Sequence, residues 1–201
     1  MARRAVDVSV WRIGFFFLTS ALFMVGQYSM NETIRSLTRT GEAGAPERSF
    51  FGFSELDLTL TLLDFTPEAR FYYFCYLGVD LISIFFTSMF LCDALALVLS
   101  ILLRNQSSSL FFIDTIPFFG AAFDLLENLT LFWIANAFPL DLELPPLTHK
   151  IALYLCLAKH YAYLLSTVLI VLIGILGVLR LLFSARSSSV SKKEDAAKKT
   201  S

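Results

Sequence analysis

The chain has 201 residues, of which 56% are hydrophobic and 16% are charged, whereas a typical soluble domain carries about 25% charged residues. A soluble domain of this length could not bury so much apolar surface. The formal net charge of −1 gives no basic face for nucleic acid. Composition therefore excludes a soluble globular protein, a disordered chain and a nucleic-acid-binding protein. It predicts that the lipid bilayer is the main partner of the chain.

Four stretches of the sequence are long and apolar enough to cross a bilayer as helices, which takes about 20 residues each. They are residues 11–30, 72–103, 110–138 and 151–183. We therefore predict an all-α protein, a four-helix transmembrane bundle over residues 1–183. A long first loop (31–70) and a polar tail (184–201) complete the chain.

Basic residues beside these stretches predict how the chain is threaded. Arg3, Arg4 and Arg12 lie at the start of the first stretch, Arg104 lies in the second loop, and several lysines follow the fourth stretch. Lys and Arg gather on the cytosolic side of membrane proteins. Both termini are therefore expected in the cytosol, and the first loop is expected in the lumen. The polar, Ser-rich tail is expected to be disordered.

The first loop carries two local signals. Residues 50–63 are apolar and partly alternating, which predicts a segment that lies on the membrane surface or caps the bundle. Thr66-Pro67-Glu68 is typical of a helix start, with an N-cap hydroxyl, a proline in the first turn and an acid near the positive end of the helix dipole. The second membrane helix is therefore expected to begin at Pro67, before the bilayer.

The C-terminus predicts a cellular address. Lys198 and Lys199 occupy the fourth and third positions from the end, which matches the di-lysine retrieval signal of endoplasmic-reticulum membrane proteins, an address that a receptor reads. Such a signal needs a cytosolic C-terminus, in agreement with the charge pattern. The alternative is a merely solvated basic tail, and with it another intracellular membrane.

Six polar residues within the predicted spans indicate a candidate site, because ionisable groups in a membrane are costly and usually face the bundle interior. At 1.5 Å per residue, five of them fall roughly 14–16 Å from their helix ends: Asp80, Glu127, Asn128, Lys159 and His160. The candidates are Asp80, Asp124, Glu127, Asn128, Lys159 and His160.

Helical spacing refines this candidate layer. Asp124, Glu127 and Asn128 share one helix face. Asp93 is thirteen residues from Asp80, so it is expected to face elsewhere. We predict that Lys159 pairs with Glu127 or Asp124, because several acids in one layer need a cation.

Two interpretations of the layer remain open. It is either polar glue between helices or a site that handles a ligand, a proton or a substrate. The sequence has no catalytic triad, no P-loop and no zinc-protease motif. The three cysteines lie in apolar runs without ligand spacing. No catalytic residue, metal site or cofactor is therefore assigned.

The segment IPFFGAAFDLLENLTLFWI (116–134) resembles a group of uncharacterised four-span membrane proteins that carry a D-x-x-E-N motif in the third helix. The likeness covers residues 66–175. It includes the Thr66-Pro67-Glu68-Ala69 helix start, the aspartate at Asp80 and a lysine like Lys159 in the last span. It implies the four-span fold and brings no biochemical activity.

A weaker likeness is to the emopamil-binding/sigma-2-receptor group. Its members are four-span endoplasmic-reticulum proteins with intramembrane carboxylates, and they bind or isomerise sterols. The overall layout is similar, with a long first lumenal loop and a basic cytosolic tail. The motif residues do not align, so no site residue is carried over.

Three functions are compatible with this sequence. The first is a non-enzymatic membrane protein of the endoplasmic reticulum with a structural, accessory or lipid-binding role, whose partner is another membrane protein or a lipid ligand. The second is a sterol- or lipid-handling enzyme or receptor that uses the intramembrane carboxylates. The third is a small transporter or proton channel. A cavity lined by the layer would favour the second over simple polar glue.

Overall fold

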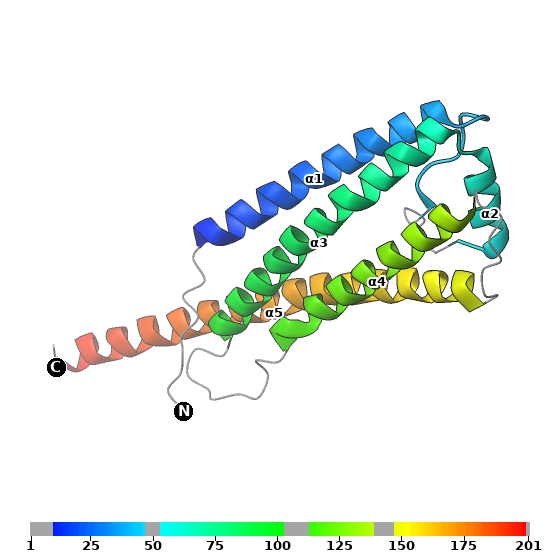
Figure 1. Ribbon diagram of the computed structural model, residues 1–201. Coiled ribbons are helices and arrows are strands. Elements are labelled where there is room, and N and C mark those ends of the chain that lie inside the picture. Colours follow the sequence, from blue (N-terminus) through cyan, green and yellow to red (C-terminus); the bar gives the residue numbers. More distant parts are fainter. Residues whose placement is uncertain (1–9, 47–52, 103–112, 139–146, 200–201) are drawn as a thin grey trace.

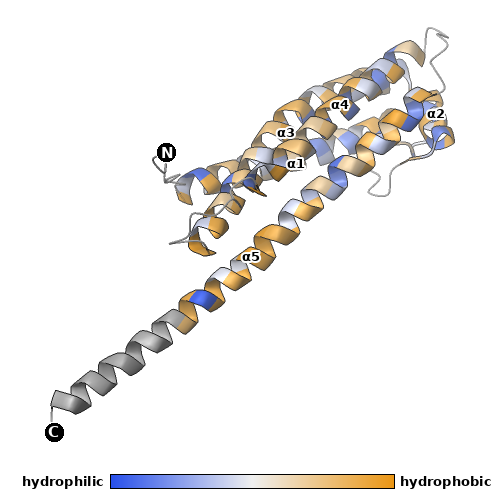
Figure 2. Cartoon of the chain, turned by 90° about the horizontal axis from the view of Figure 1, so that it is seen from below, coloured by the Kyte–Doolittle hydropathy of each residue, from blue (hydrophilic) through white to orange (hydrophobic). Residues whose placement is uncertain are grey.

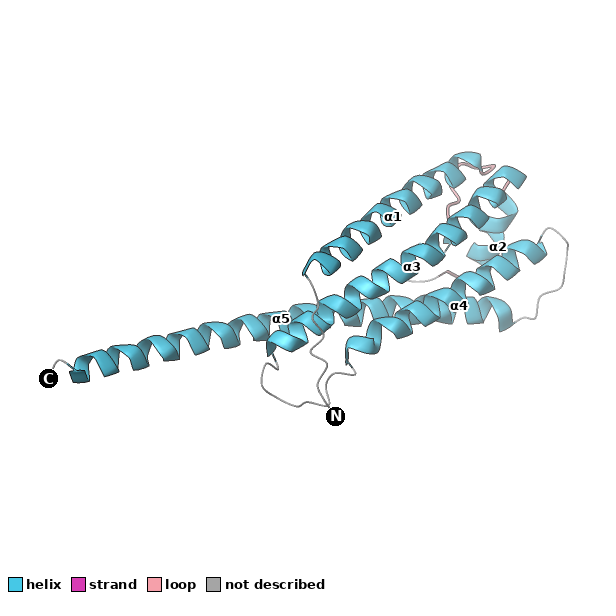
Figure 3. Ribbon diagram, turned by 60° about the vertical axis from the view of Figure 1, so that its left-hand side comes forward, coloured by secondary structure: helices cyan, strands magenta, loops and turns pink. Residues whose placement is uncertain are grey.

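The protein is an assembly of helices in the computed structural model, which describes residues 10–46, 53–102, 113–138 and 147–199. These residues contain no extended strand, only a single bridge between Thr38 and Phe65 (Figure 3). The helices are α1 (Val10–Leu37), α2 (Glu55–Asp64), α3 (Pro67–Leu102), α4 (Ile116–Ala137) and α5 (Leu147–Lys199). The predicted all-α class is confirmed.

The four long helices run alternately in opposite directions (Figure 1). α2 lies at the end where α1 stops and α3 starts, and the start of α1 lies at the opposite end. α3 is the central helix, because it packs against α1, α4 and α5. α4 also packs along α5, whereas α1 packs extensively on α3 alone.

Hydrophobic residues cover most of the length of the four long helices (Figure 2). In the described residues, four helical segments are long and apolar enough to cross a membrane: Val10–Leu37, Pro67–Leu102, Ile113–Ala137 and Leu147–Phe183. Each of the four predicted stretches overlaps one of them. At 1.5 Å per residue even the 22-residue α4 is about 33 Å long, which exceeds the hydrocarbon thickness of roughly 30 Å.

The predicted start of the second long helix is confirmed. α3 begins at Pro67, and the backbone N–H of Ala69 donates to Thr66 Oγ1 over 3.1 Å. The same hydroxyl donates to the carbonyl oxygen of Leu37, the last residue of α1, over 2.8 Å. Thr66 therefore caps α3 and also joins its start to the end of α1.

The apolar segment of the first loop forms helix α2, and it caps the bundle. Ser54 and Asp57 begin it with a reciprocal capping box, in which each side chain accepts from the other backbone N–H over 3.0 Å. Hydrogen bonds from the side chain and backbone of Ser54 lower the pKa of Asp57. Leu58 and Leu62 are buried in an apolar cluster with residues of α1, α3 and α4. This packing over residues 55–64 agrees with the predicted cap, residues 50–52 lie outside the described residues, and the position on a membrane surface stays a prediction.

The C-terminal part of α5 corrects one expectation. Disorder was predicted for residues 184–201, but α5 continues to Lys199, well beyond the ends of the other helices (Figure 1). The physical reason is local. Gly177 is the last glycine and no proline follows it, so no helix-breaking residue ends the helix that the apolar segment begins.

Replacing Leu62 by Ala tests the cap, because its side chain is 1% exposed while that of Leu63 is 50% exposed. We expect Leu62→Ala to lower the unfolding free energy by about 2–5 kcal/mol and Leu63→Ala to lower it far less. Chemical unfolding of both variants in lipid bicelles measures the difference. Equal losses would mean that α2 does not pack on the bundle.

Candidate functional site

The polar side chains lie between two apolar clusters. Tyr73 and Leu77 of α3 belong to the cluster beside α2, and Leu95 and Leu99 belong to a second cluster that joins α3 to α5. Asp80 lies between them, thirteen residues into α3, or about 20 Å from its start. Water is scarce at such a position, so each polar group needs a protein partner.

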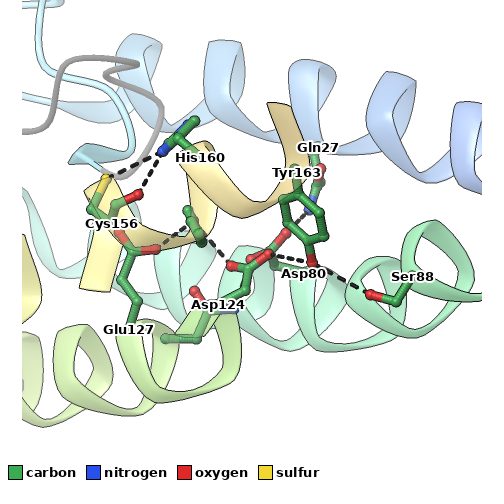
Figure 4. A network of polar contacts seen from close by, with 10 residues as sticks. Gln27, Asp80, Ser88, Asp124, Glu127, Cys156, His160 and Tyr163 are labelled. Carbon is green, nitrogen blue, oxygen red and sulfur yellow. Dashed lines mark hydrogen bonds and ion pairs between the residues drawn. The ribbon is translucent and has the colours of Figure 1, made fainter. Parts of the chain in front are cut away.

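Lys159 is the centre of the layer, and Figure 4 shows its two partners, Asp124 and Glu127, extending from α4 toward α5. Its Nζ lies 3.0 Å from Asp124 Oδ1 and 2.5 Å from Glu127 Oε2, so α5 is tied to α4 by two ion pairs. Both predicted partners are therefore engaged at once. Glu127 is completely buried, and removing one member of such a pair leaves an uncompensated buried charge.

Asp80 joins three helices in the same layer. Asn128 of α4 donates from Nδ2 to Asp80 Oδ2 over 2.6 Å, and Gln27 of α1 donates from Nε2 to Asp80 Oδ1. The two amides satisfy one oxygen each. Asp80 therefore connects α3 to α1 and to α4 without a cation of its own.

Tyr163 extends the network toward α3. Its hydroxyl donates to Asp124 Oδ2 over 3.4 Å and lies 3.5 Å from Ser88 Oγ. Both distances are long for hydrogen bonds between oxygens. The ring packs against Gly120 of α4 so closely that a Cβ at Gly120 would lie 2.8 Å from Tyr163 Cε1. Glycine at this position is what lets the tyrosine enter between α4 and α3.

His160 is positioned differently from the other predicted residues. Its Nδ1 donates to the carbonyl oxygen of Cys156, one turn earlier in α5, over 2.7 Å. The ring also borders a cavity beside the layer. The structure thus connects Asp80 with Asn128, and Asp124 and Glu127 with Lys159, while His160 lies beside these pairs.

This cavity has a volume of about 220 Å³. Residues of α1, α3, α4 and α5 border it, and at about 30 Å³ per molecule it has room for on the order of seven waters. Its lining residues are Met24, Gln27, Asp80, Ser83, Ile84, Thr87, Asp124, Lys159, His160 and Tyr163. Glu127 is absent from this lining, so the cavity meets only one side of the layer.

A line of polar contacts continues from the layer along the α1–α3 interface. Ser20 Oγ lies 2.7 Å from Thr87 Oγ1, and Arg12 Nε donates to Asp93 Oδ2 over 2.6 Å. Asp93 was expected to face elsewhere than Asp80, but both aspartates bind side chains of α1 and join α3 to that helix. The long side chain of Arg12 makes this possible by reaching the buried carboxylate from the α1 surface.

Four described members of the network in Figure 4 were not predicted as site residues: Gln27, Ser88, Cys156 and Tyr163. They carry no charge at neutral pH, so a pattern of ionisable residues does not include them. Two of them leave a signal in the spacing. Tyr163 follows Lys159 by four residues, on the same helix face, and Gln27 follows Ser20 by seven.

Comparison of the chain with family models, curated proteins and solved structures found no match. The resemblances suggested by the D-x-x-E-N segment and by the four-span layout therefore stay predictions. Function has to be inferred from the geometry of the layer and its cavity.

A double-mutant cycle on Glu127→Gln and Lys159→Gln measures the central ion pair. We expect a coupling free energy of at least about 1 kcal/mol, since both groups are buried and in contact. The matched control is Glu32→Gln with Arg35→Gln, an exposed pair at 3.4 Å on α1, for which no more than about 0.5 kcal/mol is expected. Unfolding in bicelles provides the four free energies. A buried pair with no greater coupling than the exposed one would contradict its central role.

Proposed function

We propose that this chain is a multi-pass membrane protein that binds an amphipathic small molecule, with the polar end of the ligand in the cavity beside the layer. The observation that carries the proposal is this 220 Å³ space, which is bordered by Asp80, Asp124, Lys159 and His160. Ligand sites between the helices of a bundle combine apolar walls with a few convergent polar groups. Met24 and Ile84 are the apolar residues of this lining and the others are polar, so the cavity supplies the polar part of such a site.

Polar glue alone explains only part of the layer. Glu127 has the structural role of joining α4 to α5, because it is fully buried and ion-paired to Lys159. Asp80 and His160 are half-buried and border an open space instead. Holding helices together does not require such a space, since buried polar groups are stabilised best when they are fully enclosed by partners. A ligand that completes the packing gives the cavity a use.

A second candidate, a lipid-modifying enzyme, rests on one specific contact. Asp124 and Lys159 lie 3.0 Å apart and both border the cavity, which would place a carboxyl group and a cation at one ligand position, as acid–base chemistry requires. Binding without reaction is the simpler proposal, because Lys159 is already held between two carboxylates. Turnover of the bound molecule would favour the enzyme.

We further propose the endoplasmic reticulum as the location, with both ends of the chain in the cytosol. The start of α1 and the far part of α5 lie at the same end of the bundle (Figure 1), which supports a common side. The basic residues near both ends and the lysine pair at the C-terminus support the cytosolic side.

Filling the cavity tests the binding function. Ser83 borders it and Ser100 lies exposed further along α3. We expect Ser83→Leu to remove the small molecule that co-purifies with the protein in mild detergent, because leucine occupies its space, and Ser100→Leu to retain it. Native mass spectrometry detects the bound mass. A protein without any bound molecule, or with equal occupancy in both variants, would contradict the proposal.

Extending the C-terminus tests the address. Two residues added after Ser201 shift Lys198 and Lys199 away from the positions that the retrieval receptor reads, so the protein is expected to leave the endoplasmic reticulum. As the control, Lys192→Ser with Lys193→Ser removes two positive charges from the tail and leaves the terminal lysine pair in place, so the protein is expected to stay. Fluorescence microscopy compares the locations. An unchanged location of the extended chain would rule out retrieval by this lysine pair.

A further inference from the structure

A second cavity, of about 360 Å³, lies between α3 and α4. We call it the α3–α4 groove. Its lining residues are Leu81, Ile84, Phe85, Ser88, Phe118, Ala121, Ala122 and Leu125. Ser88 is the one polar residue among them. Phe85 is 57% exposed and Phe118 is 50% exposed, so the groove presents an apolar surface to the outside of the bundle.

Tyr163 separates this groove from the polar cavity. Its side chain borders the polar cavity, and its hydroxyl lies 3.5 Å from Ser88, which borders the groove. Ile84 borders both spaces. The ring of Tyr163 also packs closely on Gly120, the neighbour of Ala121, which lines the groove. One tyrosine, whose hydroxyl makes two long contacts, therefore divides the polar space from the apolar one.

The charges around the polar cavity select the kind of ligand. Asp80 and Asp124 border it, and Glu127 lies just behind Lys159, so three carboxyl groups surround one lysine. Lys159 already has two carboxylate partners. An anionic head such as a phosphate would meet like charges, whereas a head that donates hydrogen bonds would find carboxylate oxygens.

The sizes of the two spaces fit one ligand better than two. Small-molecule pockets in proteins measure roughly 300–1,000 Å³. The polar cavity lies below that range and the groove near its lower limit. Together they fall well within it, with a polar end and an apolar end.

We propose that the polar cavity and the α3–α4 groove are two compartments of one site for a single-chain amphiphile with a hydrogen-bond-donating head, such as a long-chain alcohol or amine. The head lies beside Asp80 and Asp124. The chain passes Tyr163 and occupies the groove along Ala121 and Leu125. This inference rests on the proposed binding function and adds the ligand class and the position of its chain.

Photo-crosslinking of the full-length protein in lipid nanodiscs tests the two-compartment site. The probes are hexadecanol, hexadecylamine and hexadecyl phosphate, each with a diazirine near the end of the chain and an alkyne for detection. We expect the alcohol and the amine to label the protein at least about tenfold more than the phosphate, because of the like charges. Peptide mapping of the labelled wild-type protein is expected to place the label on Phe118, Ala122 or Leu125.

A matched pair of α4 variants adds a second measurement. Ala121 borders the groove, whereas Leu129 lies on the same helix outside it and is 55% exposed. Ala121→Trp fills the groove and is expected to reduce labelling by at least about tenfold, since the apolar chain loses its buried surface. Leu129→Trp introduces the same side chain on the outer surface of α4 and is expected to leave labelling unchanged.

The outcomes separate the two levels of the proposal. In one outcome, Ser83→Leu abolishes the labelling, but the label maps outside the groove and Ala121→Trp does not reduce it. That outcome would overturn the two-compartment site and leave the binding function intact. Equal labelling by the phosphate probe would overturn the ligand class. Labelling that is unaffected by either Ser83→Leu or Ala121→Trp would overturn both proposals.

Discussion

A lysine enclosed by carboxylates within an apolar bundle is the constraint on which the rest of this structure depends. The side chain of Lys159 cannot remain charged among Leu, Ile and Phe side chains without partners, and Asp124 and Glu127 supply them at 3.0 and 2.5 Å. Because Lys159 is on α5 and its partners are on α4, the axial register of these two helices follows from the pair. A shift by one turn would separate the charges by about 5 Å.

The remaining polar contacts extend that register to the other helices. Asp80 of α3 accepts from Asn128, which is the neighbour of Glu127 in α4, and Gln27 attaches α1 to the opposite oxygen of Asp80. Apolar side chains pack in many similar arrangements, but these hydrogen bonds form in one. The layer thus specifies how four otherwise similar apolar helices align, while the apolar clusters on either side supply most of the buried surface.

Local signals allowed much of this architecture to be predicted from the sequence. The start of α3 depends on three consecutive residues, Thr66 to Glu68, and the pairing of Lys159 follows from charge and depth alone. The cavity could not be predicted in this way, because it depends on the spacing of the four helices that line it, which side-chain packing decides. The contacts of Tyr163 could not be predicted for a similar reason, because the position of its ring depends on the absence of a side chain at Gly120, a residue on another helix. The C-terminal part of α5 is helical although disorder was predicted, because its residues are polar but none of them terminates a helix.

The narrow attachment of α1 has a consequence for how the protein is made. Its buried residues are Ser20, Gln27 and Ile34, and its polar partners Asp80, Thr87 and Asp93 all belong to α3. A ribosome synthesises α1 first and reaches Asp93 only after some eighty further residues, counted from Arg12. During that interval the amide of Gln27 and the guanidinium of Arg12 have none of these partners. Until α3 has been synthesised, the polar side chains of α1 therefore need a polar or protein-lined environment, or the headgroup region.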